Sequence, residues 1–195
     1  MKKIYHLILI CLMIVGTCSC SCNNKENDKI EYTHYANGGV TQKLKASILW
    51  EYSNDTFTKY QVSYNSYVCS NTSVNYTNVI YIELTNKGSK EDSVIRNVSF
   101  TTVEETNGDI FNVGLWGDYK EYSGQEFYMG VEEELLPKLK YMKYADISAL
   151  AEKGYKNFTY IEDIDADALA GGTVSSSNVV SIVKAIFDYH IANHY

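Results

Sequence analysis

Proline, arginine and cysteine are nearly absent from the body of this 195-residue chain. It has one proline, Pro137, one arginine, Arg96, and, after the first 22 residues, one cysteine, Cys69. A single strand-borne thiol is interpreted as a small buried hydrophobe, although a disulfide to Cys22 stays open. No apolar run after residue 22 approaches the length needed to span a membrane.

Basic residues are outnumbered by acidic ones, 17 to 24, and the net charge is −7 at pH 7. If Lys2 and Lys3 are removed with an export signal, 15 basic residues remain and the net charge is about −9. An acidic surface repels the phosphates of nucleic acids and the headgroups of anionic lipids. We therefore expect no nucleic acid among the partners.

Motifs of known catalytic and cofactor sites are missing. The sequence contains no Gly-x-Ser-x-Gly elbow, no phosphate-binding glycine loop and no zinc motif. Three alternating aspartates have the spacing of calcium ligands, but Ala168 stands where a calcium loop needs glycine, which favours a solvated acidic loop. These aspartates are Asp163, Asp165 and Asp167.

Two histidines near the C-terminus complete the search for chemistry. His190 and His194 are one helical turn apart, as zinc pairs often are, but they lie in the last six residues, where a helix frays. A pair of Cys69 with a histidine is disfavoured, because a strand offers the thiol no helix N-terminus to activate it. The sequence therefore predicts no catalytic residue, no cofactor and no metal ion.

The N-terminus, MKKIYHLILICLMIVGTCSCSC, is the most distinctive segment that is present. Two lysines precede an apolar stretch of about a dozen residues, from Ile4 to Val15, which is too short to cross a hydrocarbon core of roughly 30 Å. Small residues and three alternating cysteines follow. The arrangement resembles the signal peptides of bacterial envelope lipoproteins, in which a cysteine receives diacylglycerol and the signal is cleaved just before it.

This resemblance implies lipid attachment at Cys20, with Cys18 as the alternative. Cys20 follows the small residue Ser19, which suits the signal peptidase, whereas Cys18 follows the bulkier Thr17. Two or three acyl chains anchor stably, since each buried methylene contributes ~0.8 kcal/mol. We therefore expect a membrane partner through an N-terminal lipid, in the cell envelope, with the outer membrane as the location and surface exposure left open. The polar residues 20–37 are partly similar to the stretch after the lipidated cysteine in Bacteroidota surface lipoproteins, and they predict a flexible tether.

Between residues 38 and 130 the apolar residues recur with a period of two. The expected strands cover residues 40–52, 57–69, 74–84, 94–103 and 110–119, with polar turns between them. In the first strand the alternation predicts Leu44, Ala46, Ile48 and Trp50 on one face. Consecutive strands without intervening helices predict an antiparallel sandwich or barrel. Residues 80–111 resemble hairpins of the immunoglobulin-like sandwiches of bacterial envelope proteins, which implies such a sandwich here.

After residue 130 the pattern changes to that of helices. Helical spacing predicts a helix beginning near Leu136, a second over residues 147–152 and a last one over residues 178–192, with a strand at 157–161 between them. The last helix has a broad apolar stripe and should dock on a core.

The expected fold is mainly β, an antiparallel immunoglobulin-like sandwich followed by a smaller helical or α/β segment. Four parts are predicted: a signal peptide, residues 1–19; a tether, 20–37; a β-sandwich domain, 38–130; and a C-terminal segment, 131–195.

Two surface features complete the candidate sites. Asp92-Ser93-Val94 resembles the O-glycosylation motif of the Bacteroidota, which implies Ser93 as an acceptor. The 18 tyrosines suit a binding surface, although an AT-rich genome explains the same excess. The candidate ligand contacts are Tyr119, Tyr122, Phe127 and Tyr128, which flank the change of pattern.

The leading interpretation is a non-enzymatic envelope protein that binds a glycan or a partner protein. A small secreted hydrolase acting on polymers is the second, and it would need two carboxylates within roughly 5–10 Å in one pocket. The third is an inhibitor or a subunit of a surface complex, which would expose an apolar patch above ~600 Å².

Overall fold

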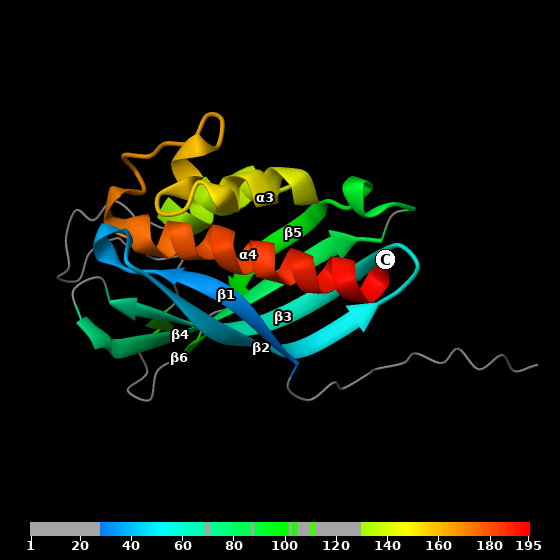
Figure 1. Ribbon diagram of the computed structural model, residues 1–195, viewed down its shortest axis with the longest axis horizontal. Coiled ribbons are helices and arrows are strands. Elements are labelled where there is room, and N and C mark those ends of the chain that lie inside the picture. Colours follow the sequence, from blue (N-terminus) through cyan, green and yellow to red (C-terminus); the bar gives the residue numbers. More distant parts are fainter. Residues whose placement is uncertain (1–27, 69–70, 87, 102, 105–109, 112–129) are drawn as a thin grey trace, which may run out of the picture.

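The structure, a computed structural model, describes residues 28–68, 71–86, 88–101, 103–104, 110–111 and 130–195. Five strands form one antiparallel sheet in which each strand pairs with the next along the chain (Figure 1). They are β1 (Lys29–Tyr35), β2 (Thr41–Ser53), β3 (Phe57–Val68), β4 (Asn71–Thr85) and β5 (Ile95–Thr101). Two short strands, β6 (Val103–Glu104) and β7 (Ile110–Phe111), pair separately.

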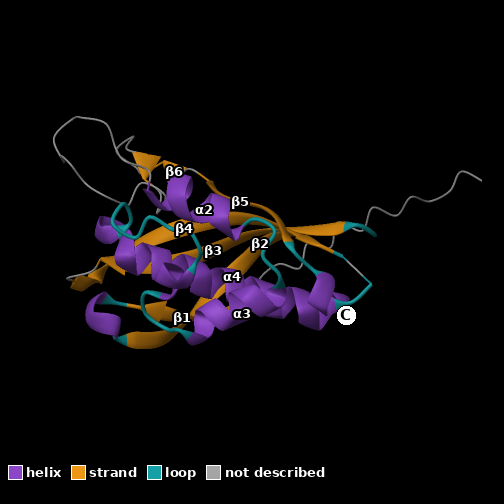
Figure 2. Ribbon diagram, turned by 90° about the horizontal axis from the view of Figure 1, so that it is seen from above, coloured by secondary structure: helices purple, strands orange, loops and turns teal. Residues whose placement is uncertain are grey.

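The helices follow the strands in the sequence and cover one face of the large sheet (Figures 1 and 2). They are the π-helical turn η4 (Val131–Leu135), α2 (Leu136–Leu139), α3 (Tyr144–Glu152) and α4 (Thr173–His194). Within the described residues, four 3-10 turns join the elements: η1 (Asn37–Gly39), η2 (Lys90–Asp92), η5 (Asn157–Tyr160) and η6 (Ala170–Gly172). The long helix α4 packs against β1 on one side and α3 on the other. Within the described residues, no helix is both long and apolar enough to cross a membrane.

Alternation along the strands explains which face is covered. In β3, Tyr60, Val62 and Tyr64 are buried, whereas the residues between them are half-exposed. The buried face shares one core with apolar residues of α4, such as Val183 and Phe187. The expected β-rich region followed by a smaller helical segment is therefore confirmed, and the two parts are packed around a common core.

The predicted tether is too long. Its second half forms β1, an edge strand in which Ile30, Tyr32 and His34 are buried. The alternation was hidden because two of these three inward positions are a tyrosine and a histidine rather than aliphatic residues.

Two further boundaries differ from the prediction. Residues 157–161, expected as a strand, form the turn η5, because Gly154 and Lys156 adopt positive φ angles (75° and 65°) that turn the chain and bring Phe158 into the core. The last helix begins at Thr173 rather than at residue 178. Three serines that precede the predicted start, Ser175, Ser176 and Ser177, are buried inside its first turns.

Helix α4 also closes the open edge of β1. The amide of Tyr35 donates to Oδ1 of Asn178 (2.7 Å), and Nδ2 of Asn178 donates to the carbonyl of Tyr35 (3.0 Å). The amide of Thr33 donates to Oγ of Ser181 (3.2 Å). Unpaired strand edges invite pairing with other chains. These helix side chains therefore satisfy the edge backbone and fix the position of α4 on the sheet.

Replacing the buried amide tests this edge contact. Asn178→Ala removes both bonds to Tyr35 and leaves a buried backbone amide and carbonyl without partners, so we expect a loss of about 1–3 kcal/mol in the free energy of unfolding. Urea unfolding followed by circular dichroism measures it. Asn193→Ala is the control, since Asn193 is exposed and bonds only the carbonyl of Tyr189 in its own helix. Equal stability of the two variants would contradict the assignment.

Candidate functional site

Two β-bulges decide which side chains the sheet presents on its open face, the face away from the helices. In β2, Ile48 lies opposite Val62. Trp50 lies opposite Gln61, so Leu49 is an extra residue between the two pairs. The extra residue reverses the alternation, and Trp50, 39% exposed, points away from the face that buries Ile48. The predicted grouping of Trp50 with Ile48 is therefore wrong, because it assumed an unbroken period of two.

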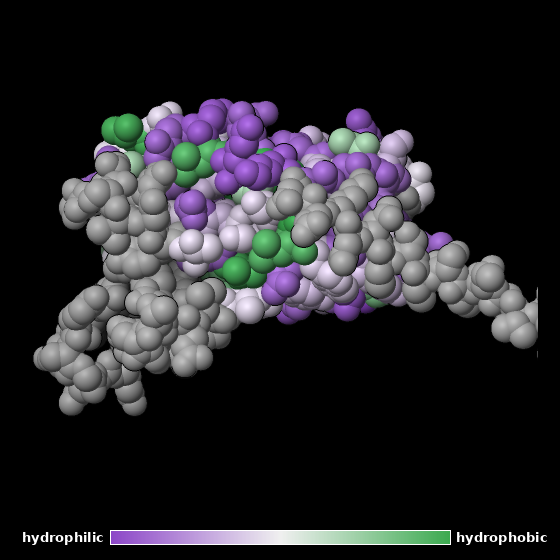
Figure 3. All heavy atoms as spheres, turned by 90° about the horizontal axis from the view of Figure 1, so that it is seen from below, coloured by the Kyte–Doolittle hydropathy of each residue, from purple (hydrophilic) through white to green (hydrophobic). Residues whose placement is uncertain are grey.

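The reversal builds an aromatic strip on the open face, formed by Trp50, Tyr52 and Phe57. The rings of Trp50 and Tyr52 are nearly parallel, with 10° between their planes and 6.1 Å between their centroids. The Phe57 ring follows, 6.3 Å from that of Tyr52. Figure 3 shows the molecule from below, where a short run of strongly hydrophobic residues lies among pale and hydrophilic ones; tryptophan and tyrosine count as slightly hydrophilic on its scale and do not form that run. The flat rings of the strip offer packing surfaces for the ring of a ligand.

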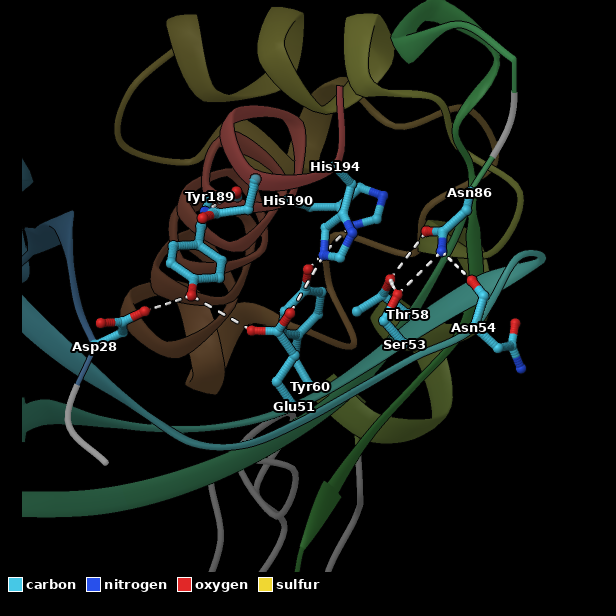
Figure 4. A network of polar contacts seen from close by, with 11 residues as sticks. Asp28, Glu51, Ser53, Asn54, Thr58, Tyr60, Asn86, Tyr189, His190 and His194 are labelled. Atoms are coloured by element: carbon cyan, nitrogen blue, oxygen red, sulfur yellow. Dashed lines mark hydrogen bonds and ion pairs between the residues drawn. The ribbon is translucent and has the colours of Figure 1, made fainter. Parts of the chain in front are cut away.

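The turn between β2 and β3 holds Phe57 in place. Oδ1 of Asn54 accepts hydrogen bonds from the amides of Thr56 (2.8 Å) and Phe57 (3.0 Å), as turn-forming asparagines do. Asn86, at the end of β4, accepts a bond from the hydroxyl of Thr58 (2.9 Å), and its Nδ2 lies 3.3 Å from Oγ of Ser53 (Figure 4). The strip therefore rests on a turn that is tied to a neighbouring strand.

A charged cluster, formed by Lys59, Tyr81, Glu83 and Arg96, adjoins the strip. Nζ of Lys59 lies 3.0 Å from one carboxylate oxygen of Glu83, and the Tyr81 hydroxyl donates to the same carboxylate. The second bulge lies in β5, where Asn97 is opposite Glu83 and Ile95 is opposite Leu84. Arg96 is the extra residue between these two pairs. Its guanidinium carbon lies 4.4 Å from the centroid of the Phe57 ring. The cluster and the strip are therefore one continuous surface.

The cluster carries a local positive charge on an acidic protein. Burial by itself would raise the pKa of the Glu83 carboxyl, but hydrogen bonds from Tyr81 and Lys59 outweigh it and hold that pKa below its usual value. The bond to Glu83 raises the pKa of Lys59 in turn. Both groups are therefore ionised at neutral pH, and with Arg96 the cluster has one positive charge in excess.

The bulge at Leu49 also turns Glu51 toward the helices (Figure 4). Its carboxylate lies 3.3 Å from Nε2 of His194 and 3.4 Å from the hydroxyl of Tyr189, both on α4. The Tyr189 hydroxyl donates to Asp28 as well (2.6 Å). These contacts tie the last turns of α4 to the start of β1 and to β2.

His190 lies between this network and the core. It is fully buried, and its Nδ1 lies 3.0 Å from the hydroxyl of Tyr60 on β3. Burial raises the pKa of Tyr60, so its hydroxyl keeps its proton and shares a hydrogen bond with Nδ1. Burial, with the charge of His194 in addition, lowers the pKa of His190 to about 4, although the Thr85 backbone and Glu51 oppose this shift. His190 is therefore neutral at pH 7.

The histidine pair is thus a structural part of the helix–sheet contact. In the described ranges, His, Cys, Asp and Glu residues nowhere form a group of three that could hold a metal ion. A cavity of about 310 Å³ lies elsewhere, between β1, α3 and α4. Its charged lining residues include the pairs Lys43–Glu31 and Lys184–Asp188.

Of the three aspartates considered as calcium ligands, Asp165 stabilises a local turn. Oδ1 of Asp165 accepts hydrogen bonds from the amides of Asp167 (3.1 Å) and Ala168 (3.0 Å). The amide of Asp165 donates to Glu134 (2.8 Å), which ties this loop to η4.

Ser93 occupies a position that bears on its predicted modification. It is fully buried, and its hydroxyl donates to the carbonyl of Thr85 (2.7 Å). O-glycosylation at Ser93 stays a prediction, and it requires the glycan to be added before this contact closes. The remaining predicted site residues lie outside the described ranges. They are Cys18 and Cys20, Cys69, and the aromatic residues Tyr119, Tyr122, Phe127 and Tyr128.

Sequence reasoning missed the strip and the cluster, although signals for both bulges are present. Ile48-Leu49-Trp50 places three apolar residues in succession, which interrupts the alternation of apolar and polar residues in this strand. Ile95 and Val98 are three residues apart and both buried, so one residue must be extra between them.

The buried histidines predict how stability depends on pH. Unfolded histidine titrates near pH 6.5, whereas His190, and likewise His34 through burial, have pKa values of about 4 in the folded protein. The unfolded chain therefore binds more protons between these values, and stability is lost as the pH falls from 6.5 toward 4, by up to about 1.4 kcal/mol per pH unit for each histidine. Urea unfolding of wild type and His190→Asn across this range should show a smaller slope for the variant. Identical slopes would contradict the neutral, buried state of His190.

Comparison of the chain with protein families, with curated proteins and with solved structures gave no match.

Proposed function

We propose that this protein is a lipid-anchored envelope protein that binds a glycan through the open face of its sheet. The observation that carries the proposal is the aromatic strip, with Trp50 39% exposed, directly beside the polar side chains of the charged cluster. The elements that carry the strip are strands and a tied turn, so the surface is formed before a ligand arrives. Such preorganisation lowers the entropy cost of binding.

The chemistry of a sugar fits this surface on two counts. A pyranose has a face of C–H groups that packs on a flat aromatic ring, and Trp50 and Tyr52 offer two nearly parallel rings. Its hydroxyls need donors and acceptors in fixed places. Gln61 lies opposite Trp50 on the neighbouring strand, and Lys59 lies opposite Tyr52, so each ring has a polar neighbour.

A partner protein is the second candidate ligand for the same face. Tryptophan, tyrosine and arginine are the residues that most often dominate the energy of protein interfaces, and all three occur here. The bulged Leu49, which is 52% exposed, adds an apolar side chain next to Trp50.

A substitution in the strip tests the glycan proposal. Trp50→Ala removes the more exposed stacking ring, so we expect at least a tenfold weaker affinity for any polysaccharide that the full-length protein, purified in detergent, retains in affinity electrophoresis. Isothermal titration calorimetry with the retained polymer measures the change. The unfolding midpoint should move little, because the indole is not part of the buried core.

Tyr160→Ala is the matched control. Tyr160 is also an exposed aromatic residue, 62% accessible, but it lies in η5 on the helical side of the molecule. Unchanged binding by Trp50→Ala, or equal losses in both variants, would overturn the proposal. Capture of an envelope protein through Trp50, without retention by any polysaccharide, would favour the second candidate.

The lipid anchor rests on the N-terminal segment alone. A short apolar stretch followed by Thr17-Cys18-Ser19-Cys20 supports cleavage before a cysteine and its acylation. The tether that would remain ahead of β1 is shorter than the sequence pattern indicated, so the folded domain would be held closer to the membrane surface.

Single cysteine substitutions test the anchor and its position. In a bacterial host that lipidates proteins, Cys20→Ser should lose the diacylglycerol mass and move the protein from the detergent to the aqueous phase, because the thiol is the acceptor. Intact mass spectrometry and detergent phase partition measure both effects. Cys22→Ser is the control and should keep the lipid. Loss of lipid in Cys18→Ser alone would assign the site to Cys18, and retention of lipid in both variants would contradict attachment at either cysteine. A wild-type protein without lipid would contradict the anchor.

A further inference from the structure

We infer that the glycan is acidic, and that Arg96 binds the carboxylate or sulfate of one of its sugars. This inference rests on the proposed function and names the class of ligand that the open face would take. It starts from the only arginine of the chain, which a bulge places at the end of the aromatic strip.

The guanidinium of Arg96 is held in place but is not used as a donor. Packing over the Phe57 ring, 4.4 Å from its centroid, restricts the side chain. The nearest carboxylate oxygen, of Glu83, is 3.9 Å from Nη1, which is too long for a hydrogen bond. Within the described part of the chain the donors of this guanidinium therefore have no acceptor, and its side chain is 41% exposed.

The surrounding charges leave that guanidinium available to an anion. Among the described residues Glu83 is the acidic group nearest to it, but its carboxylate is bound by Lys59 at 3.0 Å and by the Tyr81 hydroxyl, and only 14% of its side chain is exposed. Lys59, 30% exposed, lies 5.1 Å from the same Phe57 ring and adds a second positive charge on that side. An incoming anion thus meets two cations and one anion that is already neutralised.

The geometry of arginine matches the proposed ligand group. A planar guanidinium binds a carboxylate or a sulfate through two parallel hydrogen bonds, and stacking on an aromatic ring reduces the freedom that it loses on binding. Phe57 lies between Tyr52 and Arg96 along the surface. A sugar stacked on Tyr52 or Trp50 would therefore direct a substituent, or the next sugar, to Arg96.

Matched pairs of polymers test the inference. Polygalacturonate is compared with its carboxyl-reduced form, and dextran sulfate with dextran, in titrations with the full-length protein in detergent. We expect at least tenfold tighter binding of the charged member of a pair. The pair that shows the difference identifies the anion as a carboxylate or a sulfate, and either supports the inference.

Variants locate the effect at Arg96. Arg96→Gln should reduce affinity for the acidic polymer about tenfold and leave that for its neutral form unchanged, and Arg96→Lys should restore part of the loss, since it keeps the charge without the planar fork. Lys153→Gln is the control, because Lys153 also lies over an aromatic ring, 5.2 Å from Tyr160, but on the helical side. Circular dichroism verifies that each variant folds. If Arg96→Gln does not fold, Lys59→Gln replaces it, because loss of this second positive charge should also weaken binding of the acidic polymer.

The outcomes separate this inference from the proposed function. Equal affinity for the charged and neutral polymers, with loss of both in Trp50→Ala, would overturn the acidic ligand and keep glycan binding. Tighter acidic binding that Arg96→Gln and Lys153→Gln reduce equally would overturn the role of Arg96. Absence of binding to these four polymers and to every polysaccharide tested by affinity electrophoresis would overturn both the acidic ligand and the proposed glycan binding.

Discussion

Burial of one sheet face against α4 is the constraint on which the other features of this protein depend. A single antiparallel sheet has two faces and two open edges, and its apolar face must be covered for the sheet to be stable. Helix α4 covers that face and also satisfies the backbone of β1 through Asn178 and Ser181. Because β1 is the first strand and α4 the last helix, this contact joins the two ends of the described chain and makes the strands and helices one unit.

The opposite face of the sheet carries the aromatic strip and the charged cluster. Because of the bulge at Leu49, the side chain of Trp50 lies on the open face, and that of the next residue, Glu51, points to α4. On the helix side, Glu51, His190 and His194 fasten the last turns of α4 to β2 and β3. On the open side, the same bulge starts the aromatic strip. One irregularity therefore connects the stability of the helix contact with the composition of the aromatic strip.

Regular elements could be predicted from the sequence where the apolar pattern is uninterrupted. Strand β3 was expected over residues 57–69 and is observed at Phe57–Val68, because Tyr60, Val62 and Tyr64 alternate with polar residues. The stripe of valines and isoleucines predicted α4 and its docking on the core. The first turns of α4 were missed because they contain three buried serines. A polar serine looks the same in the sequence whether it precedes a helix or is packed inside one.

Residue patterns alone predict the period of the regular strands β2 to β5 and of α4, the order of strands before helices, the acidic net charge and the signal-like N-terminus. Each of these follows from neighbouring residues and is readable locally. Tertiary contacts place Trp50 on the opposite face from the predicted one, pack Arg96 over Phe57 and bury His190 against Tyr60. These outcomes depend on strand register, bulges and burial, which are set by contacts between segments far apart in the chain, and a local pattern marks an interrupted alternation without specifying those contacts.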